Sequence, residues 1–431
     1  MFFFFILFVA GCAVLISIAL VRPQFIYEYP YFMAATFTVF ILPQAYALYR
    51  NGWGGPYLEP MLLMCFLSLA ACWVGYLPRA HPGFIRKLNG PVNTQRFLHG
   101  GVLMVLVGWY FTYKFGTLPE DDPTRTFTGI GTIYLFFGGL VYPGFAICFY
   151  CALKSRSFFA WAMSAIAAWI PIQAAVFYGR RESTALFILS LGMSLFFIRG
   201  IRPARWLVAA AIVISMLLIP ATGEYRKTAA EDPLLALKQI DVIEQFENYF
   251  EPDAISELKN GTVLIAATQE SGEYGFGREY WNRIIFRFVP AQFFGEDFKK
   301  SLMIGGEERD WGEVVAQTAS FELPPGSTVT GLSDSFNQFG YLGCLVFAVI
   351  GYLFKNLWVA ANQPDGTIAQ ILYIQVTTSA MRASTHQTID FLPGFIYSAI
   401  FIWLVALYAR ERSGWRYETG MTLAIPRVPS K

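Results

Sequence analysis

Charged residues are scarce in this chain: Asp, Glu, Lys and Arg make up 14% of its 431 residues, whereas hydrophobic residues make up 55%. A soluble protein of this length would carry far more surface charge, so the scarcity predicts that much of the chain faces lipid. The net charge of +2 is also too small to indicate a nucleic-acid partner.

Cysteine and histidine are sparse as well, with six and three residues. Every cysteine falls in an apolar stretch and none lies in the long polar segment of the chain, which argues against disulfides and structural zinc. Cys148 and Cys151 form a C-x-x-C pair, but inside a predicted helix at membrane depth, where small packing residues are expected.

Motifs for binding nucleotides are missing too. The chain has no D-x-D pair, no P-loop and no glycine-rich phosphate loop, so a nucleotide or nucleotide-sugar donor is not expected. Glu120, Asp121 and Asp122 could hold a metal ion, but adjacent acids followed by Pro123 in a short loop are more often solvated. We therefore expect neither a metal nor another cofactor.

Long apolar runs dominate what is present. A membrane-spanning helix needs about 20 mostly apolar residues, and runs of that length fit helices rather than the short alternating segments of a barrel. The sequence thus predicts an all-α polytopic membrane protein with about 11 transmembrane helices and one large extracytoplasmic loop. The predicted spans are 1–21, 30–49, 59–77, 97–115, 129–152, 157–178, 183–199, 205–222, 337–360, 367–383 and 391–409.

Basic residues concentrate in alternate connections between these spans, which predicts that those connections are cytoplasmic. The resulting topology places the N-terminus outside and the C-terminus inside. The connections that carry the basic residues contain Arg79, Arg86, Lys87 and Arg96; Lys154 and Arg156; Arg199, Arg202 and Arg205; and Arg410, Arg412 and Arg416.

The chain divides into three parts on this reading: eight spans over 1–222, a large periplasmic loop over 223–336, and three spans with a cytoplasmic tail over 337–431. The loop has twice as many acidic as basic residues and is too long for a simple connection. Apolar spacing predicts an amphipathic helix over 233–249 and a second helix over 277–288, stopped by Pro290.

Charged residues at the outward helix ends are costly, so we take them as the first candidates for function. Gly179-Arg180-Arg181-Glu182 separates two spans with almost no loop and places two arginines on the outward side. They are either an anion clamp or a salt bridge to Glu182 combined with snorkelling to lipid headgroups.

A second arginine group, Arg278, Arg283 and Arg287, lies on the predicted helix near 277–288, where Arg283 and Arg287 are four residues apart and share a face. An interfacial helix that binds phospholipid headgroups is the plainer interpretation. Nearby aromatic residues suit either an interface or a surface that stacks on sugars. The stacking candidates are Tyr280, Trp281 and Trp311.

A third group, Arg382, His386 and Asp390, has members four residues apart, which would line one face if the turn between the last two spans were helical. Hydrogen bonds and ion pairs among the three side chains would offset the cost of placing them near the membrane, without any catalytic role. His386 is the only histidine on the outward side and a candidate general base, with Asp390 and two other carboxylates as alternatives. Those two are Glu182 and Asp334.

Arginine suits a diphosphate because its planar fork donates two parallel hydrogen bonds and stays charged at physiological pH. Several arginines that converge from separate loops would stabilise the charge that develops as a lipid diphosphate leaves. The residues therefore favour a lipid-linked donor, used without a metal, whose tails enter between helices.

In layout the chain resembles the oligosaccharide repeat-unit polymerases, the O-antigen polymerase group called Wzy, and more distantly the O-antigen ligases. The resemblance rests on the Gly179–Glu182 turn, the Arg283/Arg287 stretch before Pro290, and the segment STVTGLSDSFNQFGYLGCL, in which the long loop re-enters the membrane. It implies a GT-C-like helical bundle in the bacterial inner membrane with its active site on the periplasmic side.

The implied reaction is an inverting glycosyl transfer, in which a glycan leaves undecaprenyl diphosphate and joins a hydroxyl of another lipid-linked repeat unit. A flippase and a chain-length regulator would be partners. The implied diphosphate-binding residues are Arg180, Arg181, Arg278, Arg283, Arg287 and Arg382, with His386 in the place of a ligase histidine.

Two other functions stay open at this point. A ligase would grip the same donor and differ only in its acceptor. A polyprenyl-sugar transporter or flippase would be expected to show ionisable residues at mid-membrane and repeated halves, and the sequence shows neither.

Overall fold

The computed structural model describes residues 2–119, 129–251, 254, 256–306, 315–316, 321–322 and 328–411. Within these residues the chain is helical apart from connections and one isolated bridge, between Val92 and Arg410. Of the predicted features, Glu120–Asp122, Trp311, Arg412, Arg416 and most of the loop over 305–327 lie outside the described residues.

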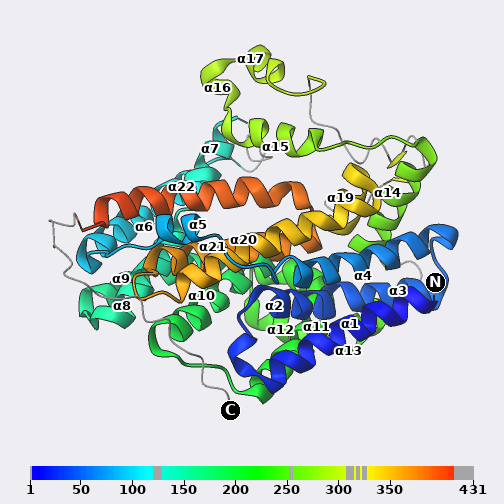
Figure 1. Cartoon of the computed structure of the whole chain (residues 1–431), viewed down its shortest axis with the longest axis horizontal. Helices are drawn as coiled ribbons and strands as arrows, with labels where there is room; N and C mark the ends of the chain where they lie inside the picture. Colours follow the sequence, from blue (N-terminus) through cyan, green and yellow to red (C-terminus); the bar gives the residue numbers. More distant parts are fainter. Residues whose placement is uncertain are drawn as a thin grey trace.

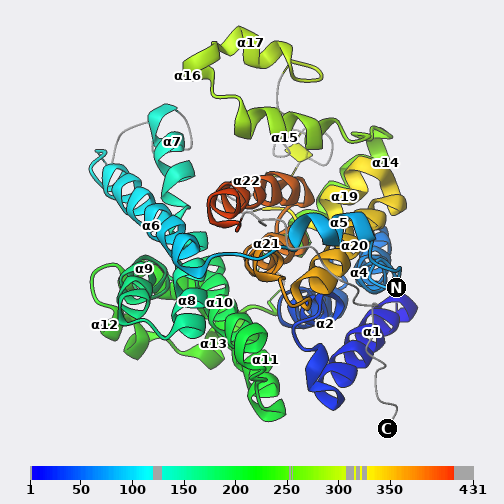
Figure 2. The same ribbon diagram turned by 60° about the vertical axis from the view of Figure 1, so that its left-hand side comes forward.

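The helices before the long loop pack as a bundle (Figures 1 and 2). They are α1 (Phe2–Val21), α2 (Tyr29–Thr36), η2 (Phe37–Ile41), α3 (Leu42–Asn51), η3 (Gly55–Tyr57), α4 (Leu58–Val74), α5 (Pro82–Leu88), α6 (Thr94–Gly116), α7 (Gly129–Gly138), α8 (Val141–Ser155), α9 (Phe158–Val176), α10 (Arg181–Arg199) and α11 (Arg205–Ala229).

The helices of the loop and of the last part of the chain follow. They are α12 (Pro233–Gln239), α13 (Val242–Asn248), α14 (Glu257–Ser271), α15 (Arg278–Phe288), α16 (Ala291–Phe294), α17 (Glu296–Ser301), α19 (Gly331–Phe339), η5 (Gly340–Cys344), α20 (Leu345–Ala361), α21 (Thr367–Thr385), η6 (Thr388–Asp390) and α22 (Phe391–Ala409).

Nine helical segments in the described part are long and apolar enough to cross a membrane. The chain is therefore a helical multi-pass membrane protein. The predicted spans 97–115 and 367–383 are helical, as α6 and α21, but are not among the nine. For α21 the reason is its position: 14 of its 19 residues are buried, at the centre of the bundle in Figure 2, so it need not be as apolar as a lipid-facing helix.

The predicted helix over 233–249 is two helices, α12 and α13, so the expectation of one continuous helix was wrong. The Asp241 carboxylate accepts hydrogen bonds from the backbone N–H groups of Ile243 and Glu244, both at 3.0 Å. This is an N-cap, and it starts a second helix where apolar spacing alone suggested continuity.

Hydrogen bonds between connections define the two ends of the bundle. At one end, the Asn93 amide donates to the Ala409 carbonyl and the Gly90 amide to the Asp365 carbonyl. At the other, the Tyr57 hydroxyl donates to Glu270 of the long loop at 2.7 Å. Because α4 begins after Tyr57 and ends before the basic connection 79–96, that connection and the long loop lie at opposite ends of α4.

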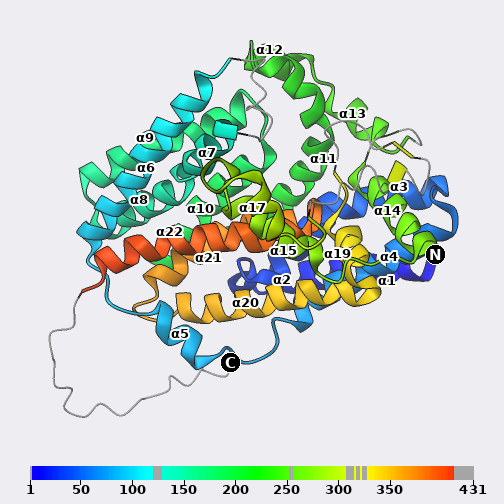
Figure 3. The ribbon, with the colours of Figure 1, turned by 90° about the horizontal axis from the view of Figure 1, so that it is seen from above.

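The loop returns to the bundle through α19, whose first residue explains how closely it packs. A Cβ atom on Gly331 would lie 1.6 Å from the Ala383 carbonyl oxygen, so only glycine lets α19 meet the end of α21. The chain then bends at Gly340, with φ of +59°, before α20. Helix α15 lies over α22 in Figures 1 and 3, and α16 and α17 stand away from the bundle in Figures 1 and 2.

Candidate active site

The turn between α21 and α22 is the centre of the site. Helix α21 ends at Thr385, and His386 adopts φ of −124° and ψ of −86°, which breaks the helix. Gln387 and the three-residue 3-10 helix η6 follow, and η6 ends at Asp390, whose side chain does not cap α22. Its carboxylate is therefore available to other groups.

Asp390 binds two arginines from different parts of the chain. Arg283 Nε of α15 lies 2.9 Å from Asp390 Oδ1, and Arg382 Nη2 of α21 lies 3.1 Å from Oδ2. The side chains of Asp390 and Arg283 are 17% and 24% exposed, so water screens this group only in part. Two cations on one carboxylate leave the group with a net positive charge.

Arg287, one helical turn beyond Arg283, adds a third positive charge. Within the described residues its guanidinium forms no hydrogen bond and no ion pair within 4 Å, in contrast to Arg283 and Arg382. The residue as a whole is exposed, yet protein packed around the guanidinium lowers its pKa; the charge of Asp390 opposes this shift, and the positive charges of Arg382 and Arg283 add to it. The site thus has an uncommitted donor beside a positive cluster, a suitable environment for an anion.

Asp334 supports the same turn from the opposite side. Its side chain is buried, and Oδ2 accepts hydrogen bonds from the Thr388 amide at 2.7 Å, the Ile389 amide at 3.2 Å and the Thr388 hydroxyl. Since the Thr388 hydroxyl gives its hydrogen to Asp334, the Tyr280 hydroxyl, 2.6 Å away, is the donor to Thr388. Asp334 therefore fixes the turn that carries Asp390 and does not bind the arginines.

Tyr280 is committed to this network. Its ring stacks on Phe339, with centroids 6.2 Å apart and planes 16° from parallel, and its hydroxyl bonds Thr388. Burial, followed by the charge of Asp334, raises the pKa of Tyr280, so the phenol keeps the proton that it donates. In this structure Tyr280 connects α15 to the turn and presents no free ring face on the Phe339 side for a sugar.

His386 is neutral at physiological pH. Burial lowers the pKa of its imidazole to about 4, with further contributions from Arg382 and Arg181. His386 Nδ1 lies 2.9 Å from the Thr385 hydroxyl, which itself donates to the Met381 carbonyl. We assign the Nδ1–H tautomer from this network, which leaves Nε2 as a free acceptor.

The charged residues of the Gly179–Glu182 motif have different surroundings. Glu182 Oε2 lies 3.7 Å from Arg382 and belongs to the cluster, whereas Arg181 pairs with Glu257 of α14 at 3.8 Å. Arg180 is exposed at the start of α10. Gly179 takes a left-handed conformation, and its carbonyl accepts two hydrogen bonds from Arg226 of α11, at 3.0 and 3.2 Å.

Two residues named from the sequence lie away from the cluster. Arg278 pairs with its neighbour Glu279 at 2.9 Å rather than with Asp390. Trp281 donates its indole N–H to the Leu302 carbonyl at 2.9 Å and so holds the segment after α17 against α15. Its ring remains 47% exposed, so a stacking surface is still present there.

Sequence reasoning missed Gln387 and Thr388. Gln387 accepts a hydrogen bond from Arg283 at 3.3 Å, and Thr388 relays between Tyr280 and Asp334. Their position between His386 and Asp390 was the one available signal. Among the described residues no group of three or more His, Cys, Asp or Glu side chains could hold a metal ion.

Comparison with protein-family models, with curated proteins and with solved structures finds no match for this chain. The chemistry of the site is therefore the basis for a function.

Proposed function

We propose that this protein is a metal-independent glycosyltransferase that uses a polyprenyl-diphosphate-linked glycan as its donor and polymerises oligosaccharide repeat units. The observation that carries the proposal is the convergence of Arg283, Arg287 and Arg382 on Asp390, beside a neutral His386. The three guanidinium groups outnumber the two carboxylates of the cluster, Asp390 and Glu182, and this net positive charge suits a diphosphate.

The arginines would stabilise the charge that appears on the diphosphate as the bond from the anomeric carbon to its oxygen breaks. A hydroxyl of the incoming repeat unit forms the new bond to that carbon, and its proton passes to His386 Nε2. The undecaprenyl diphosphate departs with the electron pair of the broken bond.

Binding of the diphosphate donor would also make His386 a stronger base. The positive charges of Arg382 and Arg181 contribute to the low pKa of His386, and an anionic diphosphate beside them would oppose that effect. The pKa of His386 would then rise towards the working pH, where a general base is most effective. Glu182 and Asp390 are less suited because each lies within 4 Å of arginine.

For the topology we propose eleven spans, with α6 and α21 crossing the membrane within the bundle and the site facing the periplasm of a bacterial inner membrane. Support comes from the basic connection 79–96 and from Arg410, which lie together at the end of α4 opposite to the long loop. Since α21 carries Arg382 at its last turn, its crossing is what brings that arginine to the outward face.

The test uses purified protein in nanodiscs with undecaprenyl-diphosphate-linked repeat units and no nucleotide, and follows glycan length on a gel. A ladder of longer lipid-linked products is expected, and an Arg283→Ala variant that elutes as the intact protein serves as the inactive control. If the substrate is bound but stays one unit long, the polymerase proposal fails. Transfer to an added lipid A core or protein acceptor would then identify a ligase.

A further inference from the structure

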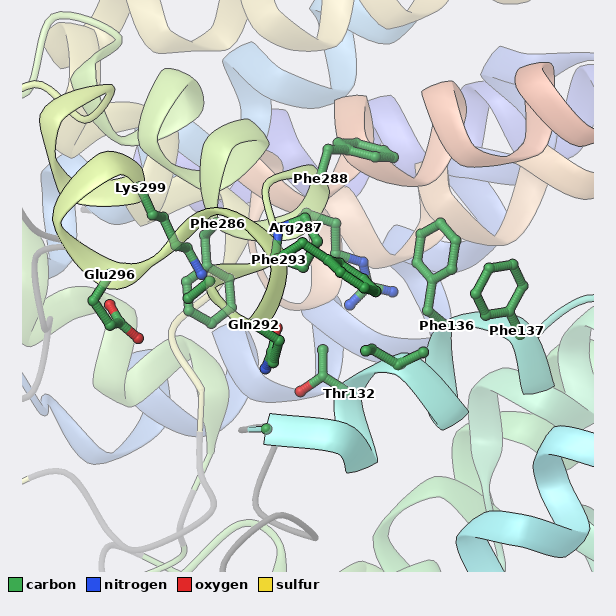
Figure 4. A pocket seen from close by; sticks show the side chains of 14 residues that line it. Thr132, Phe136, Phe137, Phe286, Arg287, Phe288, Gln292, Phe293, Glu296 and Lys299 are labelled. Atoms are coloured by element: carbon green, nitrogen blue, oxygen red, sulfur yellow. The ribbon is translucent and has the colours of Figure 1, made fainter.

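A cavity of about 300 Å³ opens between α7 and the segment from α15 to α17 (Figure 4). Its volume is at the lower end of the range for ligand pockets, so it fits part of a large ligand rather than all of it. The lining is rich in aromatic rings, with Phe136 and Phe137 from α7 facing Phe288 and Phe293 from the loop.

Helix α7 is fixed beside the candidate active site by α22. The Tyr397 hydroxyl of α22 donates to the Phe136 carbonyl at 2.7 Å, and the two rings meet edge to face with centroids 4.8 Å apart. On another face of α7, Leu135 is 37% exposed, as expected where a helix faces lipid. The cavity therefore lies at the lateral edge of the bundle.

Arg287 connects the cavity with the cationic cluster. It belongs to the lining, and Figure 4 shows its guanidinium between Phe293 and Phe136. The same side chain interacts electrostatically with Asp390, Arg283 and Arg382. The lining is mainly apolar, and besides Arg287 its charged members are Glu296 and Lys299. The cavity thus meets, at Arg287, a positive charge that has no ion-pair partner within the described residues.

The wall of the cavity that the loop forms is open to solvent. The Phe293 side chain is 75% exposed although it lines the cavity. Transfer of an aromatic ring from water into apolar surroundings is favourable, so an apolar ligand that covers Phe293 would bind favourably. A ligand that is apolar along its chain and doubly anionic at its head matches this arrangement.

We propose that the cavity between α7 and α15–α17 holds the first isoprenoid units of the lipid carrier, with Arg287 at its diphosphate, and that the carrier enters here from the bilayer. This inference rests on the proposed function. It assigns the lipid to one side of the cluster, so the glycan extends towards His386 and Glu182 on the other side.

A crosslinking experiment tests the assignment without any need for turnover. The photoreactive residue p-benzoylphenylalanine replaces Phe293 in one variant and Tyr113, a 69% exposed residue of α6, in a control. Both are reconstituted in nanodiscs of phosphatidylethanolamine and phosphatidylglycerol with a trace of labelled undecaprenyl diphosphate. Crosslinking at 293 should exceed that at 113 at least fivefold, and excess unlabelled undecaprenyl diphosphate, but not phosphatidylglycerol, should abolish it.

Equal crosslinking at the two positions, or equal competition by phosphatidylglycerol, would overturn the proposal and identify a general phospholipid contact. A second variant fills the cavity: Ile133→Trp adds bulk from a lining residue of α7, whereas Leu135→Trp adds it at an exposed position of α7 on another face. The first should raise the KM for the lipid-linked donor at least tenfold with kcat little changed. The second should leave both constants within twofold.

The two proposals fail in different ways. Specific crosslinking at 293 without any glycan transfer would overturn the proposed polymerase and support the lipid site. Glycan transfer that survives Ile133→Trp unchanged would support the enzyme and overturn the lipid site.

Discussion

Two aspartates lie at the turn between α21 and α22: Asp334 reaches it from α19, and Asp390 is part of it. They differ in burial and in the groups that they bind. Asp334 is fully buried and accepts hydrogen bonds from two backbone amides and one hydroxyl. Asp390 is partly exposed and accepts from two arginines, one of which reaches it from the long loop. One carboxylate fixes the position of the turn, and the other gathers the charges that would bind a substrate.

The largest effect on stability and activity should come from substitution of the buried aspartate, Asp334. Asp334→Ala leaves three donors without an acceptor, and each such loss costs about 1–3 kcal/mol, so both thermal stability and glycan transfer should fall severely. Asp334→Asn, which retains one oxygen, should be milder in both. The measurements are thermal unfolding in detergent and the polymerisation assay, with Asp297→Asn on the exposed α17 as a neutral control. Normal stability of Asp334→Ala would contradict a supporting role.

Substitution of Arg283, which binds the partly exposed Asp390, should reduce activity without changing the fold. Arg283→Ala removes a donor at the place where charge develops, and we expect about 10²–10³-fold slower transfer with little change in unfolding temperature. Arg283→Lys keeps the charge but loses the fork that reaches both Asp390 and Gln387, so it should recover little. Full activity of the lysine variant would show that charge alone suffices.

His386 should give an effect of about 10²-fold on substitution by Ala, within the range of general-base catalysis. The pH profile is more specific. With its pKa lowered to about 4 in the free enzyme, the acid limb of kcat/KM should break near pH 4 rather than near the ordinary histidine value of about 6.5. A break near pH 6.5 that disappears in His386→Ala would show that the site is more open to water than the structure indicates.

Stability should follow the same titration with a definite sign. Because the folded-state pKa is depressed, the unfolded chain binds a proton that the folded chain does not between about pH 6.5 and 4. The titration of His386 should therefore contribute a loss of stability as pH falls through this window, so His386→Gln should lose less stability than the wild type when thermal unfolding is measured across this pH range.

The smallest effects should come from the arginines away from Asp390. Arg181 pairs with Glu257, and Arg278 with Glu279. We expect Arg181→Ala to slow transfer by less than about tenfold, through its distant charge on His386, and Arg278→Ala to leave kcat within about twofold. Side-by-side kinetics of both variants with Arg283→Ala would test this ranking, and an Arg278→Ala defect as large as that of Arg283→Ala would reverse it.

The helical content of the chain could be predicted because apolar length and the position of proline are local properties. Helix α15 ends at Phe288, two residues before Pro290, as expected. The break between α12 and α13 depended on one N-cap at Asp241, which apolar spacing does not reveal. Similarly, a span of mixed polarity such as α21 is explained only by its burial at the centre of the bundle.

The site could be predicted in part. The sequence named the residues around Asp390, but it placed Arg278 with Arg283 and Arg287. Five residues along a helix amount to about 140° of rotation, so Arg278 faces away from Arg283, and helical geometry alone could have separated them. The role of Asp334 could not be foreseen, because it depends on Gly331 meeting Ala383 across 52 positions of sequence, as the close approach of these residues shows.

The position of Arg283 on the loop and of Arg382 on a membrane helix has a further consequence. If α15 moved away from α22, Arg283 and Arg287 would leave with the loop, and Arg382 would remain with two carboxylates, those of Asp390 and Glu182. The attraction for a diphosphate would then largely vanish. Packing of α15 against α22 and assembly of the arginine cluster thus occur together. The protein would therefore bind a diphosphate tightly only while α15 is packed against α22.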